Sequence, residues 1–453
     1  MMKKAVLLFL LMPLGWGVMP TATAQERLWT ADDCMGYAVA NSPAVRKQLY
    51  KNDTHQAEYK AAVASFFPSL TTSVSTQHNF GRAVDPETNT YVNTTTFNNY
   101  YEGYTSLPLF DGGQLVNQLR MAKVNRQAGM NDLQKAKDDL ALVTLEAFVN
   151  VLYYRGTVRF AAEKREESHR LLYKVRREEE LGLKGSADVA LAEAQAAGDD
   201  YILANQQHLY HTAMLKLKEH MNYPSGETLE IDTAVAAPEL LPHAGEPAQA
   251  IFESAQATNP TALQAGFKVD IARKQLLIRR GQLFPTVSLS AGVYTSYYKN
   301  LKSEVKPNAF GTQFANNRGE YVSLNFRFPM FNGLTRLKEV RTARNQMRIA
   351  REEQTEVLRQ LQTAVEQSLA DRDDYALESI RMEKKLHADE LAYRLTLRKF
   401  EEGLMSPLDV QTCAGTLLES KATLLQKQLM YLLKCRQVDY YSGKPIIRTH
   451  NAR

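Results

Sequence analysis

Cysteine is scarce in this chain, with three residues in 453, and this excludes a scaffold held together by disulfides. A surplus of one charge is also missing, because 55 Lys and Arg stand against 50 Asp and Glu. A net charge of +5 over this length gives no reason to expect a nucleic-acid partner. The chain is nevertheless 44% hydrophobic, which excludes wholesale disorder. Its length predicts several domains or a repeat architecture.

One apolar run stands out, and it lies at the N-terminus. Residues 1–24 combine the basic Lys3 and Lys4, an apolar stretch at 5–14 and a small-residue cleavage site at 22–24, which is the pattern of a secretory signal peptide. A membrane anchor is the alternative, but the run is short and prolines interrupt it. Removal of this segment takes away two lysines and leaves a net charge of +3. No later stretch is apolar enough for a spanning helix, so any membrane span of the exported chain must be β-structure.

The two halves of the sequence resemble each other. Four pairs of motifs keep their order and spacing: 41–45 with 259–263, 67–70 with 284–287, 107–112 with 328–333, and 182–189 with 403–410. The second pair is offset by 217 residues and the last two by 221 residues. Four ordered motifs over such a distance indicate that one structural unit is duplicated.

Each half is predicted to form a helix, two strands, a long helix and a further helix. Proline ends helices, and alternation of apolar and polar residues marks strands. In the first repeat, 25–221, we expect helices at about 31–66, 113–180 and 187–221, and strands at about 69–80 and 97–108. In the second repeat, 248–441, we expect helices at about 248–283, 334–401 and 408–441, and strands at about 286–298 and 320–329. Segment 222–247 is a linker with a candidate strand at 228–232, and 442–453 is a basic tail.

The strand segments have two different faces. In 69–80 the even positions include Leu70, Val74 and Phe80, while the odd positions are Ser, Thr, Gln and Asn. Such strands are typical of a membrane β-wall, in which tyrosines at 91, 100, 101, 104, 294, 297 and 298 would suit an interfacial girdle. A soluble sandwich is the alternative. Because four strands cannot close a barrel, either the chain oligomerises or the sheet is soluble.

The two long helices need neighbours along their whole length. Neither 113–180 nor 334–401 contains a proline, and 68 residues at 1.5 Å each would extend for roughly 100 Å. A lone helix of this length is not stable by itself. Small and apolar residues recur every three or four positions from Leu133 to Ala161, as in a coiled-coil seam. The shorter helices at 187–221 and 408–441 are the expected partners.

Together these features resemble the TolC-like outer membrane efflux protein family. The resemblance rests on the signal peptide, the duplicated unit, the F-P and P-x-F-[DN]-G junctions and the paired G-L-x-x-x-x-D-V turns. It implies a mainly α fold with membrane β-structure, in which a homotrimer closes a 12-stranded β-barrel from four strands per chain. The helices would form a trimeric α-barrel tunnel continuous with that barrel, and 222–247 would belong to an equatorial layer.

The resemblance implies a passive exit duct. Such a protein lies in the outer membrane of a Gram-negative bacterium, extends into the periplasm, and serves tripartite efflux or type I secretion. Its partners would be a periplasmic adaptor (membrane fusion) protein, an inner-membrane transporter and outer membrane lipid. The sequence contains no phosphate loop, paired metal-ligand motif or nucleophile elbow, so we expect no enzyme activity, no cofactor and no metal. A periplasmic coiled-coil scaffold or adaptor without a membrane span is the alternative. No pattern identifies the substrate.

By this resemblance, the two helix–helix turns lie at the periplasmic tip, where they close the tunnel and meet the adaptor. The turn residues expected to contact the adaptor are Gly182, Leu183, Gly403, Leu404 and Ser406. Asp409 falls at the pore-facing aspartate position of the family, and three copies would form an acidic ring that favours cations. An ordinary first-turn carboxylate, stabilised by the helix macrodipole, is the alternative.

Four other residues are candidates for the pore constriction. Asp188 is the first-repeat equivalent of Asp409, and Phe400 stands where the family often has a tyrosine that locks the closed tip. Met405 and Thr412 replace an arginine and a second aspartate of the best-known family pattern. The polar lock is therefore depleted, and we expect packing to hold the closed state.

Overall fold

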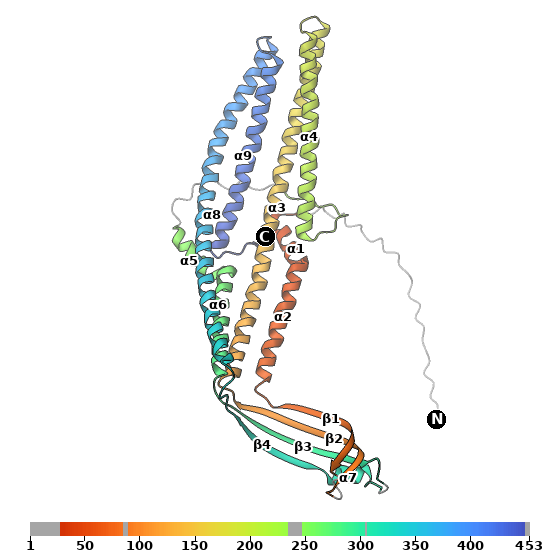
Figure 1. Cartoon of the computed structure of the whole chain (residues 1–453). Coiled ribbons are helices and arrows are strands. Elements are labelled where there is room, and N and C mark those ends of the chain that lie inside the picture. The colour runs from red at the N-terminus through yellow and green to blue at the C-terminus, as the bar shows by residue number, and fades with distance from the viewer. Residues whose placement is uncertain (1–27, 85–88, 234–246, 304–305, 449–453) are drawn as a thin grey trace, which may run out of the picture.

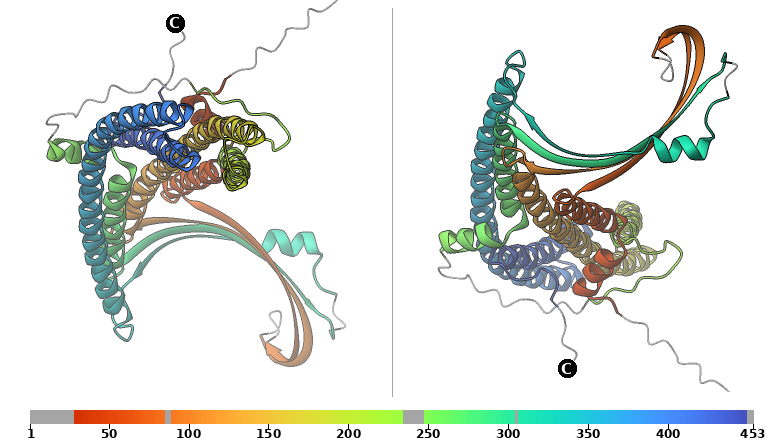
Figure 2. Two further views of the ribbon diagram at one scale, coloured as in Figure 1. Left: turned by 90° about the horizontal axis from the view of Figure 1, so that it is seen from above. Right: turned by 90° about the horizontal axis from the view of Figure 1, so that it is seen from below.

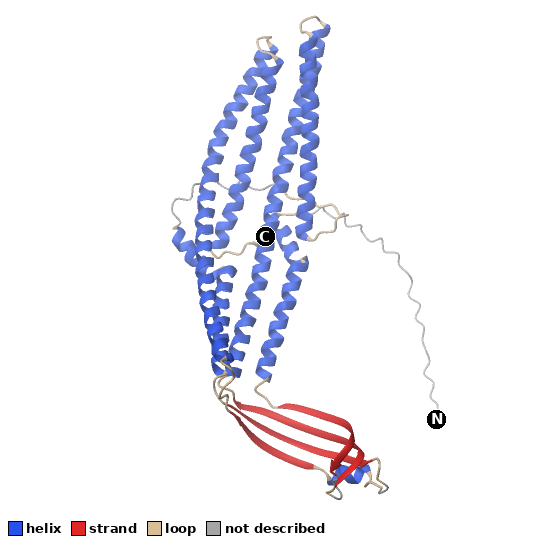
Figure 3. Cartoon of the chain, viewed as in Figure 1, coloured by secondary structure: helices blue, strands red, loops and turns tan. Residues whose placement is uncertain are grey.

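The computed structural model describes residues 28–84, 89–233, 247–303 and 306–448. The expected signal peptide, 1–24, lies outside the described residues. The molecule is elongated: helices run along its length, and a sheet lies at one end (Figures 1 and 3). The sheet is strongly curved, as the views from above and below show (Figure 2). Among the described residues, no helix carries an apolar stretch sufficient to cross a membrane.

The order of elements repeats in the two halves. The first half contains α1 (Ala31–Asn41), α2 (Pro43–Ala64), β1 (Ser69–Val84), β2 (Tyr91–Phe110), α3 (Gln114–Glu180) and α4 (Ser186–Met221). The second contains α5 (Ala248–Thr258), α6 (Pro260–Gly281), β3 (Thr286–Asn300), α7 (Phe310–Asn316), β4 (Gly319–Arg327), α8 (Thr335–Glu401) and α9 (Pro407–Tyr441). The predicted duplication and the mainly α class with a four-stranded sheet are confirmed.

The single helices predicted over 31–66 and 248–283 are wrong, because each is broken in two. The breaks fall before Pro43 and Pro260, which begin α2 and α6. Proline forces the preceding residue into an extended conformation, and its missing amide makes it suitable for the first position of a new helix. Ser42 caps α2 by accepting a hydrogen bond from the amide of Ala44 at 3.2 Å, and Asn259 caps α6 in the same way.

The sheet has the antiparallel order β1-β2-β3-β4, and its register gives it two distinct faces. Successive partners across the strands form rows. One row consists of four serines, Ser69, Ser106, Ser290 and Ser323. The next row, on the opposite face, consists of Leu70, Thr105, Ala291 and Val322. On this apolar face Leu70 is 79% exposed and Val322 is 77% exposed, so the single chain covers neither.

The register divides the tyrosines that were expected to form a girdle. Tyr101 and Tyr297 lie on the apolar face, in the rows of Val74 and Thr76. Tyr100, Tyr104, Tyr294 and Tyr298 lie on the polar face. An additional short helix, α7, lies against the end of the sheet, where the carbonyl of Phe314 accepts a hydrogen bond from Thr295 at 2.7 Å. No helix was predicted between the strands at 286–298 and 320–329, so α7 is a difference from the expected order of elements.

The helices form two long hairpins, α3 with α4 and α8 with α9 (Figure 1). At 67 residues each, α3 and α8 extend for roughly 100 Å. Nearer the sheet, α2, α3, α6 and α8 lie side by side in that order. The largest apolar core lies midway, where α1, α3, α4 and α9 meet around Leu145, Phe148 and Leu217. The candidate strand 228–232 forms a single bridge, between Trp29 and Ile231, at this level.

Candidate functional site at the hairpin tips

Both hairpin tips turn with the same backbone geometry. Gly182 and Gly403 adopt φ angles of 75° and 76°, a left-handed conformation that glycine takes without strain. The amides of the next residues, Leu183 and Leu404, each donate to a helix carbonyl at 2.8 Å, which completes a Schellman motif. The two leucines are each 71% exposed. The five turn residues expected to contact an adaptor, Ser406 included, are all exposed at the ends of the hairpins (Figure 1).

The two candidate carboxylates accept hydrogen bonds at the starts of α4 and α9, and in α9 the bonds are reciprocal and form a capping box. Asp409 accepts hydrogen bonds from the amide and the hydroxyl of Ser406, at 2.9 and 2.7 Å. Asp188 accepts a hydrogen bond from the amide of Gly185 at 3.2 Å. The hydrogen bonds from Ser406 hold the pKa of Asp409 below its ordinary value. Asp409 is therefore an exposed, ionised side chain whose hydrogen bonds with Ser406 stabilise the start of α9.

Phe400 is buried between the hairpins. Its ring is 3% exposed and lies in an apolar cluster to which all four long helices contribute. The buried members are Leu172, Val175, Ala192, Ala196, Tyr393, Phe400 and Val410. The ammonium groups of Lys174 and Lys184 lie 4.8 and 5.6 Å from the ring centroid. Phe400 thus joins the two hairpins by packing and by cation–π contacts.

The other two constriction candidates differ in exposure. Met405 is half-buried and packs against the cluster around Phe400. Thr412 is exposed, and its hydroxyl donates to the carbonyl of Leu408 at 2.9 Å within α9. Met405 thus adds to the apolar packing at the tip, whereas the hydroxyl of Thr412 is occupied within its own helix.

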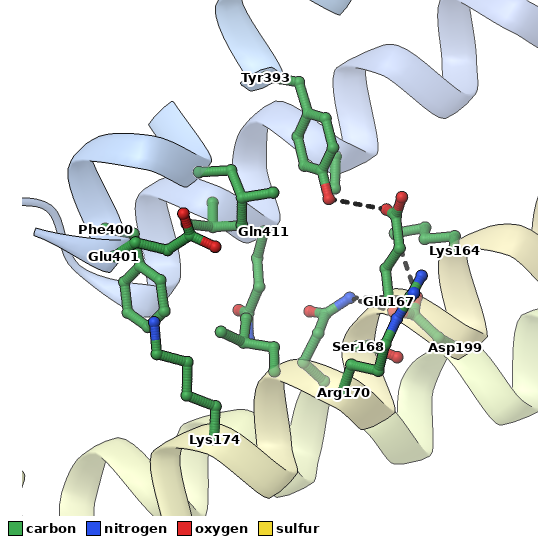
Figure 4. A pocket seen from close by; sticks show the side chains of 15 residues that line it. Lys164, Glu167, Ser168, Arg170, Lys174, Asp199, Tyr393, Phe400, Glu401 and Gln411 are labelled. Atoms are coloured by element: carbon green, nitrogen blue, oxygen red, sulfur yellow. Dashed lines mark hydrogen bonds and ion pairs between the residues drawn. The ribbon is translucent and has the colours of Figure 1, made fainter. Parts of the chain in front are cut away.

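A cleft of about 320 Å³ separates the hairpins beside this cluster (Figure 4). Across it, the hydroxyl of Tyr393 on α8 donates to the carboxylate of Glu167 on α3 at 2.8 Å. Burial and the nearby carboxylate raise the pKa of Tyr393, so the hydroxyl keeps its proton and remains a donor. Lys421 on α9 forms a second link, an ion pair with Glu163 on α3 at 3.0 Å.

An ion pair that was not predicted from the sequence lies at the cleft wall. Lys164 on α3 lies 3.0 Å from Asp199 on α4, whose side chain is 1% exposed. Asp199 follows Ala192 and Ala196 at three-to-four-residue spacing, so it occupies the apolar seam of α4. A buried carboxylate needs a cationic partner, so the position of Asp199 in the apolar seam was the sequence signal for this ion pair. Tyr393 and Glu167 gave no such signal, because their contact depends on the approach of two distant helices.

Comparison with known proteins agrees with this architecture. The family model described as "Outer membrane efflux protein" matches residues 35–222 and 251–443. This chain belongs to that family. Within the outer membrane efflux proteins, it is 24% identical over 326 residues to outer membrane protein TolC of Escherichia coli, covering 68% of this chain and 62% of TolC. It is 23% identical over 330 residues to protein CyaE of Bordetella pertussis, covering 73% of this chain and 66% of CyaE. The matched region therefore spans slightly less than two thirds of the length of each of these two relatives.

Solved structures of efflux proteins share the fold. The Campylobacter jejuni CmeC outer membrane channel aligns with a TM-score of 0.78 at 13% identity, over 93% of this chain and 87% of CmeC. The Neisseria gonorrhoeae MtrE outer membrane channel, in its open state, aligns with a TM-score of 0.67 at 16% identity, over 92% of this chain and 91% of MtrE. The duplicated hairpins and the four-stranded sheet are thus the efflux-protein architecture.

Proposed function

We propose that this protein is a passive outer membrane exit duct of a tripartite efflux or type I secretion system. The observation that carries the proposal is the two-faced sheet, in which a row of four serines backs onto a row of exposed apolar residues. An apolar face that the chain leaves uncovered suits lipid, and a polar face suits a water-filled passage. A periplasmic scaffold without a membrane span has no use for such a face.

A homotrimer would close the wall. Among the described residues, β1 and β4 are the edge strands of the sheet, and each pairs with a neighbour on one side only. Open edges of this kind cannot remain unpaired in lipid, because their amides and carbonyls would lack partners. Pairing β4 of one copy with β1 of the next would close 12 strands from three chains.

The hairpin tips are the proposed contact with a periplasmic adaptor and, through it, with an inner-membrane transporter. The exposed turn residues Leu183, Leu404 and Ser406 would meet the adaptor. TolC, CmeC and MtrE are named as outer membrane proteins or channels, which supports the same location here. Energy for transport would come from the transporter.

Asp409 is the proposed selectivity residue of the tip, where three copies would form an acidic ring. The decisive experiment is single-channel recording from the purified protein in a planar bilayer. Asp409→Asn keeps an oxygen for the cap but removes the charge, so we expect the preference for cations to fall at least about twofold. Glu402→Gln removes a charge from the same tip without touching the N-terminal cap of α9, and it serves as the matched control.

Each result of that recording has a clear meaning. Discrete openings with reduced cation preference in Asp409→Asn alone support both the duct and the ring. Equal selectivity in wild type and Asp409→Asn removes the ring but keeps the duct. Folded wild-type protein that never inserts contradicts the duct and favours the periplasmic scaffold.

A further inference from the structure

The four connections between sheet and helices expose apolar side chains. In the last of them, between β4 and α8, Met330 is 91% exposed and Phe331 is 83% exposed. We call the following residues of the connections and of the adjoining end of β2 the apolar belt: Phe66, Phe67, Leu109, Phe110, Leu283, Phe284, Phe328, Met330 and Phe331, each at least 38% exposed. Side chains of this kind at one level of a molecule mark a surface that water does not cover.

A dense group of cations follows immediately on the helix side. We call the 17 residues nearest the sheet in α3, α6 and α8, namely 114–130, 265–281 and 335–351, the basic collar. It contains 14 Lys and Arg against two acids, Asp270 and Glu339, a net charge of +12. Since the whole chain has a net charge of +5, the rest of the sequence is net negative. The positive charge is therefore concentrated at one level of the molecule.

All but one of the collar cations lack a carboxylate partner among the described residues. Within the described part of the chain, Arg279 is the one collar cation in an ion pair, with Glu339 at 3.2 Å. Arg120, Arg280, Arg341 and Arg344 are exposed. Fourteen cations within about 25 Å of helix repel one another, so such a cluster needs an anionic partner. Nothing in the adjoining sheet supplies one, because Glu102 and Glu320 are the only acids in its described strands.

We infer that the collar cations nearest the sheet, which include Arg120, Arg280 and Arg341, bind the phosphate groups of anionic phospholipids in the leaflet that faces the helices. This inference rests on the proposed function, which puts the sheet in the bilayer. The headgroup layer is roughly 5–8 Å thick on each side of the hydrocarbon. Arg341, six residues into α8, lies about 9 Å beyond the start of that helix, and so does Arg120 in α3. Cations at this depth, next to an apolar belt, match the juxtamembrane clusters that attract anionic lipid.

A second copy of the chain is a poorer fit to the collar. Helices α2 and α8 are the two outer members of the layer beside the sheet, so a cyclic trimer would bring them together. At the level of the collar, residues 48–64 of α2 carry Lys51 and Lys60 against Asp53 and Glu58, so this stretch is net neutral and supplies no surplus of acids. Charge complementarity therefore favours lipid phosphate over a neighbouring α2.

The test compares two matched triple variants. The collar variant carries Arg120→Gln, Arg280→Gln and Arg341→Gln. The control carries Arg359→Gln, Arg381→Gln and Arg398→Gln, which removes the same charge from exposed positions of α8 at least 36 Å from its sheet end. Native mass spectrometry of the detergent-purified oligomer would count retained phosphatidylglycerol against phosphatidylcholine. We expect wild type and control to prefer phosphatidylglycerol, and the collar variant to lose about tenfold of that preference. Bilayer insertion and conductance of all three proteins are recorded in parallel.

The outcomes separate the inference from the proposed function. Wild-type channels that insert and conduct without preferring phosphatidylglycerol overturn the lipid assignment and leave the duct intact. Failure of the wild type to insert overturns both. Inorganic phosphate that displaces the lipid at equal phosphate concentration shows an anion site without lipid specificity, and this also contradicts the assignment. A collar variant that falls apart into single chains would assign these arginines to the contact between copies.

Discussion

Gly112 and Gly333 occupy equivalent positions in the two repeats but have different surroundings. Both precede a long helix and adopt left-handed φ angles, of 71° and 63°. A Cβ atom on Gly112 would lie 2.2 Å from the carbonyl oxygen of Gly281 at the end of α6. A Cβ atom on Gly333 would meet nothing within 4 Å. The first junction is thus packed against a neighbouring helix, whereas the second is open.

Alanine at these two glycines is expected to destabilise the protein unequally. Gly333→Ala should lower the free energy of unfolding by about 1 kcal/mol, because only the left-handed backbone is strained. Gly112→Ala should lower it by at least about 2 kcal/mol more, since the backbone of Gly281 cannot move away cheaply. Denaturant unfolding of the detergent-solubilised protein measures both. Equal losses would contradict the close contact between Gly112 and Gly281.

The residue scale also shows the limit of sequence reasoning. The motif that ends in Gly112 marked a repeated junction between a predicted strand and a predicted long helix. The partner Gly281 could not be predicted, since it is distant in the sequence and belongs to another junction. Asp409 was placed correctly at a helix start, but its hydrogen bonds with Ser406 became visible only in the structure.

At the scale of elements, the two faces of β4 give a direct test of the membrane wall. Val322 belongs to the apolar face, and its neighbour Ser323 belongs to the polar face. If the apolar face meets lipid, Val322→Arg should cost about 2–4 kcal/mol at mid-depth. Ser323→Arg should cost less than about 1 kcal/mol, because a passage is wet.

Unfolding from lipid vesicles, followed by heat-dependent gel mobility, would compare the two arginine variants. A larger loss of stability in Val322→Arg than in Ser323→Arg supports contact between the apolar face and lipid. A larger loss at Ser323 would instead show that the polar face is the buried one, and the sheet would then belong to a soluble protein.

Elements with a clear period were the most predictable. Alternation located the strands, and β1 and β3 begin at the predicted residues, Ser69 and Thr286. The break between α1 and α2 was not predicted because both segments have a helical composition. Only Ser42, which caps α2, and Pro43, which begins it, mark the interruption. Helix α7 was missed because seven residues carry too little periodicity to be recognised.

At the scale of the whole molecule, the tips of the hairpins are held together by few contacts. Phe400→Ala would remove the most deeply buried aromatic ring of the cluster and should cost about 3–5 kcal/mol locally. If the tips close the duct, this variant should conduct more or open more often than wild type in single-channel recordings. Tyr393→Phe removes only the hydrogen bond with Glu167 and should have a smaller effect in the same direction.

Leu404→Ala is the control for these tip variants. Leu404 lies on the same turn but is 71% exposed, so its loss should leave the hairpins joined. Conductance that changes equally in Leu404→Ala and Phe400→Ala would show that the turn surface, and not the packing between hairpins, sets the opening.

The overall shape was partly predictable for a physical reason. Two proline-free helices of this length cannot be stable alone, so bundling with 187–221 and 408–441 had to follow. Which hairpins approach each other, and at which height, depends on side chains far apart in the sequence, such as Glu167 and Tyr393. The resemblance to efflux proteins supplied the arrangement that periodicity alone does not contain.

Because α3 is long, a small tilt of the helix about the central core moves its far end by a large distance. Glu167 lies 22 residues from Leu145 of that core, about 33 Å along the helix. A tilt of only about 2° at Leu145 therefore displaces Glu167 by roughly 1 Å, enough to break its 2.8 Å hydrogen bond with Tyr393. A rotation that leaves the packing of the central core intact is therefore large enough to separate the two hairpins at Glu167 and Tyr393.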